Sequence, residues 1–156
     1  MIDIAHIHPM LVHFPIVFFI TATVIFLVLA LKSGNLTARE CLPLTGVAAL
    51  VIGLLMAYMA AFFGDIALDA AVAKGFAAAP LERHEEMAMV TLTVFSLLAI
   101  VLLLATWKKI SLVRNRAWYF FAAAAVGIVL LLVTAYFGGD LVYHIGVNVD
   151  SVIPLK

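Results

Sequence analysis

Five histidines carry the clearest chemistry of this 156-residue chain: His6, His8, His13, His84 and His144. Three of them stand within eight residues of one another, just before a long apolar run. Neutral imidazole is the commonest metal ligand in proteins, and it also binds haem iron. The histidines therefore predict a metal or haem site, provided that the fold brings them to one place.

The elements that must position these histidines belong to an integral membrane protein. The chain is 67% hydrophobic and 12% charged, with a mean hydropathy of +1.23, whereas a soluble domain is about half apolar and about a quarter charged. The formal net charge is zero, so we expect the lipid bilayer as partner and no nucleic acid. The single cysteine, Cys41, excludes an internal disulfide and a CxxC motif for covalent haem attachment.

Four apolar runs are long enough to cross a bilayer, because a helix needs about 20 residues to span a hydrocarbon core of ~30 Å. The runs do not alternate, and four strands could not close a barrel. We therefore expect an all-α integral membrane protein, a four-helix up-down bundle made of two repeated αα-hairpins, as one transmembrane domain over residues 1–156. The expected helices are about 9–31, 43–64, 84–107 and 117–138, with an alanine-rich interfacial segment at about 66–79.

The charges predict how this bundle is oriented. Six of the nine Lys and Arg residues lie in the turn between the first two helices or in the turn between the last two. Eight of the nine Asp and Glu residues lie at the opposite end. By the positive-inside rule the two basic turns face the cytoplasm and both termini face out. On this topology all five histidines lie near the outer face.

The two halves of the sequence resemble each other at a period near 75. Residues 60–68 (AAFFGDIAL) parallel residues 135–143 (AYFGGDLVY). The pattern predicts two hairpins of common origin, related by an axis along the membrane normal. Small residues along the second and fourth helices either permit close helix packing or leave room for a flat cofactor. The residues matched at an offset of 74 or 76 are Gly53 with Gly127, Gly64 with Gly138, and His8 with His84.

Helix geometry gives the histidines different neighbours. His8 and His13 are five residues apart, about 140° around a helix, so we expect them to bind different things. His13 is expected to point into the bundle and to pair with His84, which opens the third helix on the same side. His8 is expected to pair with His144 at a second site, and His6 is expected to take no part in either site.

Two acids and two prolines bear on the same end of the bundle. Asp65 and Asp140 follow the repeated glycines, and each either hydrogen-bonds an imidazole in support of the site or is solvated at a helix end. Pro9 suits the first turn of a helix. Pro15 lies deeper, where it either kinks the helix or separates an interfacial turn at residues 9–13 from it.

Residues 8–15 (HPMLVHFP) and 138–147 (GGDLVYHIGV) resemble the end motifs of a widespread group of bacterial four-helix membrane proteins catalogued as a domain of unknown function. The resemblance covers essentially the whole chain, and the two motifs are fairly specific. Members occur beside, or fused to, Rieske and other redox modules. The resemblance therefore implies an electron-transfer setting in the bacterial inner membrane.

The resemblance carries over directly to His8, His13 and His84. The chain departs from the family pattern near its end, where the family more often has a histidine immediately before the glycine. This chain has Ile145 at that position, and its histidine, His144, comes one residue earlier.

We therefore expect a b-type cytochrome with one or two molecules of haem b near the outer face. It would pass electrons between the quinone pool and a periplasmic or membrane redox partner. We expect an electron-transfer protein or subunit rather than a stand-alone enzyme. It could form a homo-oligomer or belong to a larger complex. One alternative is a zinc or copper site built from the same side chains. Another is an assembly subunit without a cofactor. The expected axial ligands are His13, His84, His8 and His144.

Overall fold

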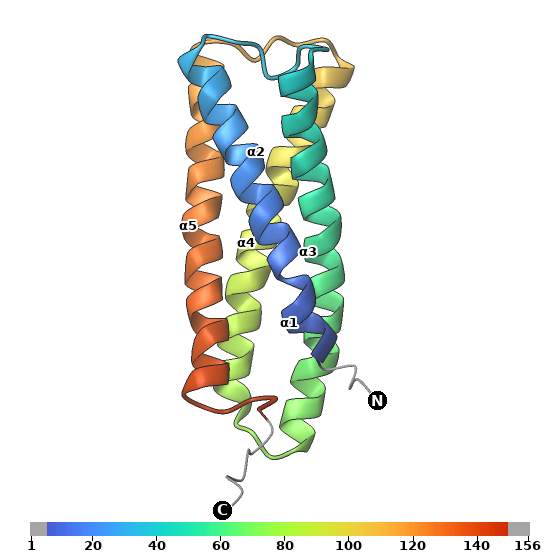
Figure 1. Cartoon of the computed structure of the whole chain (residues 1–156), viewed down its shortest axis with the longest axis vertical. Coiled ribbons are helices and arrows are strands. Elements are labelled where there is room, and N and C mark those ends of the chain that lie inside the picture. Colours follow the sequence, from blue (N-terminus) through green and yellow to red (C-terminus); the bar gives the residue numbers. More distant parts are fainter. Residues whose placement is uncertain (1–5, 150–156) are drawn as a thin grey trace, which may run out of the picture.

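The computed structural model describes residues 6–149, and these residues form one elongated helical bundle (Figure 1). Four of its segments are long and apolar enough to cross a membrane, the first made of two consecutive helices. The expected all-α four-helix up-down membrane bundle is confirmed. The helices are α1 (Ile7–Leu11), α2 (His13–Leu31), α3 (Cys41–Ala73), α4 (Ala78–Trp107) and α5 (Asn115–Tyr143).

The first membrane segment is interrupted at Val12. The amide of Val12 still donates to the carbonyl of His8 at 3.1 Å, but the next bond, from Ile16 to Val12, is long at 3.5 Å. Pro15 has no N–H to offer the carbonyl of Leu11, so the chain cannot continue as a regular helix here. Of the two arrangements that Pro15 allowed, the structure has the separate short helix, and α1 lies against α3 (Figure 1).

The second membrane segment is longer than the sequence indicated. α3 continues without a break to Ala73, and its 33 residues give a length of about 50 Å, well beyond a hydrocarbon core of about 30 Å. Residues 66–73 are mostly alanine and other good helix formers, and the helix stops only before Gly75, which adopts a φ of +92°. The segment expected at 66–79 is therefore not a separate interfacial helix, and α4 begins at Ala78 instead of residue 84.

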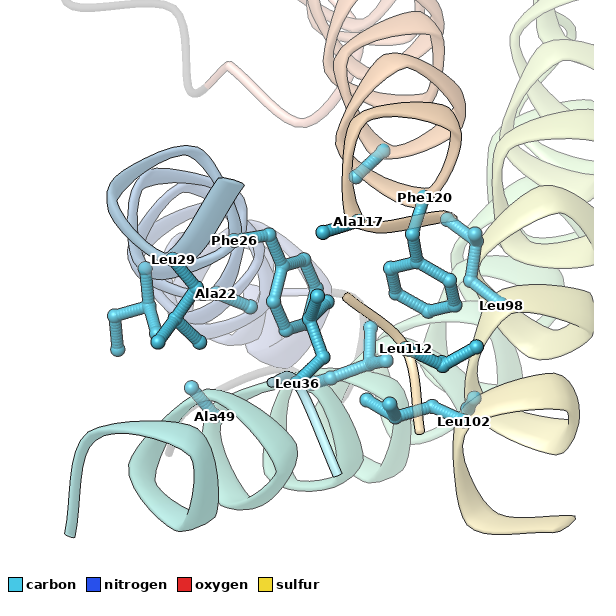
Figure 2. Close-up of a cluster of buried hydrophobic side chains, with 14 of the residues drawn as sticks. Ala22, Phe26, Leu29, Leu36, Ala49, Leu98, Leu102, Leu112, Ala117 and Phe120 are labelled. Carbon is cyan, nitrogen blue, oxygen red and sulfur yellow. The ribbon is translucent and has the colours of Figure 1, made fainter. Parts of the chain in front are cut away.

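The core of the basic end is packed with apolar side chains from all four segments (Figure 2). Phe26 of α2 and Phe120 of α5 meet edge to face, with ring centres 5.1 Å apart. Leu36 and Leu112 come from the two turns, and both are buried in this core. The turns therefore close this end of the bundle instead of merely connecting helices.

One side chain ties the two basic turns together. Asn35 Oδ1 accepts hydrogen bonds from the backbone amide of Thr37 at 3.1 Å, from its hydroxyl at 2.8 Å, and from the amide of Leu112 at 3.0 Å. The amide of Leu36 also donates to the carbonyl of Leu112. The two bonds that involve Leu112 cross between turns that are more than 70 residues apart in the sequence and fix one hairpin against the other.

Candidate functional site

Two histidines meet at the end of the bundle opposite the basic turns. The imidazole of His8, on α1, faces that of His84, near the start of α4. Their ring centres are 6.1 Å apart and their planes are nearly perpendicular, at 82°. Both residues are half-buried. The pair therefore lies inside the bundle end, with one ring from each half of the chain.

Each imidazole is held by a backbone carbonyl of the next membrane segment. His8 Nδ1 donates to the carbonyl of Ala60 on α3 at 2.7 Å, and His84 Nδ1 donates to the carbonyl of Thr134 on α5 at 3.1 Å. A carbonyl oxygen only accepts, so the proton of each neutral ring is on Nδ1. Nε2 then carries the free lone pair that a metal needs, and the carbonyl fixes the orientation of the ring.

Glycines let both rings lie directly against a helix backbone. Gly64 is one turn after Ala60, and a Cβ there would come within 3.1 Å of His8 Nδ1. Gly138 is one turn after Thr134, and a Cβ there would come within 2.9 Å of His84 Cε1. The repeated glycines of the sequence thus make room for an imidazole. A bulkier residue would push each ring off its carbonyl.

The same construction recurs deeper in the bundle with two phenylalanines. Phe19 and Phe95 stack face to face, with ring centres 3.8 Å apart and planes 6° apart. Phe19 lies against Gly53, and Phe95 lies against Gly127. Both rings are buried. They form an apolar layer on the membrane side of the histidines.

A second apolar cluster lies on the other side of the histidines. Ala71 comes from the extension of α3, Leu81 from the first turn of α4, Leu141 from the last turn of α5, and Val147 from the segment after it. Leu81 precedes His84 by nearly one turn, and Leu141 follows Gly138 by the same distance. The histidines therefore lie between two apolar layers. The outer layer was not predicted from the sequence, because the expected second helix ended at residue 64, before Ala71.

The surroundings of the two histidines differ in polarity. Thr134, whose carbonyl binds His84, also places its hydroxyl 3.0 Å from the hydroxyl of Thr91, and both threonines are buried. On the other side the corresponding carbonyl belongs to Ala60, which has no hydroxyl. His84 is therefore next to a polar pair that His8 lacks.

The structure brings His8, and not His13, to His84. His13 is the first residue of α2 and is exposed. The short helix α1 packs against α3 and turns His8 inward. His8 therefore occupies the place opposite His84 that was expected of His13, and the break at Val12 is the physical reason.

The expected pair of His8 with His144 is not formed. His144 follows α5, and its Nδ1 lies 2.5 Å from Asp140 Oδ1, with 76% of its side chain exposed. Asp140 thus binds an imidazole outside the facing pair, and Asp65 is exposed on α3. Backbone carbonyls hold the facing pair in place of these two acids. His6 is the N-cap residue of α1 and makes no side-chain capping bond.

The number of available ligands restricts the cofactor. Within residues 6–149 no group of three or more His, Cys, Asp or Glu side chains could hold a metal ion. Protein-bound zinc takes three or four such ligands. Two histidines instead suit a metal whose other ligands come from a prosthetic group, as in haem.

Comparison with known proteins agrees with the membrane character of the bundle. A family model described as "Predicted membrane protein (DUF2231)" matches residues 5–151, which is nearly the whole chain. No curated protein and no solved structure matches the chain.

Proposed function

The chain belongs to the DUF2231 family of predicted membrane proteins, and we propose that it is a b-type cytochrome in which His8 and His84 bind one haem from opposite sides. The proposal rests on a single observation, the facing of these two imidazoles inside the bundle end.

The spacing of the two rings fits a shared metal ion. A metal bound at about 2 Å by one nitrogen of each imidazole would keep the ring centres roughly 6 Å apart. The observed separation of 6.1 Å agrees with this value. The hydrogen bonds from both Nδ1 atoms leave Nε2 of each ring as the nitrogen with a free lone pair.

The donor set favours haem over zinc or Cu(II). Haem brings four ligand nitrogens of its own, so His8 and His84 would be enough to hold its iron. Attachment would be non-covalent, because the chain's one cysteine cannot form the CxxC part of a covalent-haem motif. We therefore expect haem b. One such haem would use both inward-facing histidines, which leaves His13 and His144 without this role.

Bound haem would supply one-electron transfer, and the protein would hold and shield it. The carbonyls of Ala60 and Thr134 orient the imidazoles of His8 and His84, while Gly64 and Gly138 allow these rings to approach the helices. The stacked phenylalanines on the membrane side and the apolar cluster on the other side would limit the access of water to the site.

The expected topology indicates the side of the membrane on which electrons would be exchanged. The site lies at the end of the bundle that the positive-inside rule places outside a bacterial inner membrane. We propose that electrons pass there between membrane quinone and a redox partner on the outer side. One haem at one end would not carry electrons across the bilayer alone.

The test is an absorption spectrum of the full chain purified in detergent, with haem measured per polypeptide. We expect a Soret band, a low-spin reduced spectrum and about one haem per chain. His8→Ala and His84→Ala should both lose the low-spin signal, whereas the matched control His13→Ala, a histidine on the same membrane segment, should keep it.

Three outcomes would contradict the proposal. The protein could stay colourless and bind no added haem, it could purify with zinc or copper instead, or the low-spin signal could survive in both His8→Ala and His84→Ala. If only His13→Ala lost the low-spin signal, the iron ligand on the first membrane segment would be His13 and not His8.

A further inference from the structure

A shallow groove of about 430 Å³ lies between α4 and α5 near the basic turns. Its walls are apolar and include Leu97 and Val101 of α4 and Ala123 of α5. Arg116 and Tyr119, in the first two turns of α5, also line it, and Arg116 is the one charged residue in this lining. The groove is far from the histidines, which lie at the other end of both helices.

The turn between α4 and α5, from which Leu112 lines the groove, carries an excess of positive charge. Lys108, Lys109, Arg114 and Arg116 stand within nine residues, and the sequence has no Asp or Glu between residues 87 and 139. Among the described residues, none of these four cations has a carboxylate within 4.0 Å. Arg116 Nη1 donates to the carbonyl of Ser111 at 3.2 Å, and a guanidinium has five N–H donors, so most of them are available to a ligand.

We propose that this groove binds one anionic diacyl phospholipid, with its phosphate at Arg116 and an acyl chain along the apolar walls. Basic residues beside grooves between transmembrane helices recognise anionic headgroups. Tyr119 is exposed in the second turn of α5, next to the basic turn, and aromatic residues at the ends of membrane helices contact headgroups. A quinone would use the apolar walls equally well, and its carbonyl oxygens could accept hydrogen bonds from Arg116, but it has no negative charge to pair with the guanidinium. The charge therefore favours the lipid.

Native mass spectrometry of the full chain in a neutral detergent tests the proposal. Phosphatidylglycerol and phosphatidylcholine with identical acyl chains are titrated in parallel. One lysine or arginine near a headgroup is worth a factor of about five in affinity, so phosphatidylglycerol should bind at least about fivefold more tightly. Arg116→Gln should remove about that factor for phosphatidylglycerol and leave phosphatidylcholine unchanged. The control Lys32→Gln removes a cation from the other turn and should change neither.

A second pair of variants tests the apolar walls. Ala123→Trp fills the groove and should weaken the binding of both lipids, whereas Ala122→Trp places the same bulk on the neighbouring exposed position, outside the groove lining. If Ala123→Trp does not fold, the comparison of headgroups and Arg116→Gln still decides. Equal affinity for the two headgroups, unchanged binding in Arg116→Gln, or displacement of phosphatidylglycerol by a short-chain ubiquinone at equal concentration would overturn the proposal.

Discussion

The imidazole rings of His8 and His84 face each other with their centres 6.1 Å apart, although the two residues are 76 positions apart in the sequence. The first ring is tied to the carbonyl of Ala60 on α3, and the second to the carbonyl of Thr134 on α5. Helices from both halves therefore hold one pair of side chains. Any change that moves α3 or α5 at this end should alter the pair.

Gly138→Ala should disturb the site, because the added Cβ would lie 2.9 Å from His84 Cε1. Overpacking of this kind costs about 1–3 kcal/mol of stability, against about 1 kcal/mol gained from alanine in a helix. Gly139→Ala is the matched control, because its Cβ would meet nothing closer than Tyr143 at 3.9 Å. We expect Gly138→Ala to unfold at lower SDS concentration and to lose bound haem. If Gly138→Ala and Gly139→Ala behaved alike, the close approach of His84 to the helix at Gly138 would have no role in stability or in haem binding.

Phe95→Ala should be strongly destabilising. The ring of Phe95 is fully buried, stacks on Phe19 and packs against Gly127. Removing such a side chain costs about 3–5 kcal/mol, which unfolding in mixed detergent micelles would measure. Phe62→Ala is the control, because that ring is 62% exposed on the lipid-facing side of α3 and should change stability little. A similar loss in both variants would mean that the stacked pair is not a packing centre.

Asn35→Ala should loosen the basic end of the bundle. The amides of Thr37 and Leu112 would lose their shared acceptor, and each donor left unpaired costs about 1–3 kcal/mol. Asn35→Asp keeps an oxygen at the same position and should retain most of the stability. The two variants are compared by thermal unfolding followed by circular dichroism. If Asn35→Ala were as stable as the wild type, the hydrogen bonds to Asn35 would not be what holds the two turns together.

The topology has its own test. Six of the nine basic residues lie in the two turns at one end, so both termini should be outside. Alkaline phosphatase is active only when exported, and fused after Lys156 it should be active. The same enzyme inserted in the turn at Lys109 should be inactive. The reverse pattern would place the histidine pair on the cytoplasmic side.

The sequence by itself determined the class of the protein and the contents of each end. Runs of about 20 apolar residues have one stable form in lipid, the helix, because every backbone polar group must be paired within the segment. The histidines and the glycines at Gly64 and Gly138 could therefore be assigned to one end from their positions alone. Such arguments need only the local sequence.

Tertiary structure alone decided which side chains meet. The direction of a side chain depends on the rotation of its helix, and the break at Val12 sets that rotation for α1, so His8 turns inward while His13 stays exposed. The carbonyl partners at Ala60 and Thr134 could not be read from the sequence either, because every residue has a carbonyl and only the packing of helices selects one.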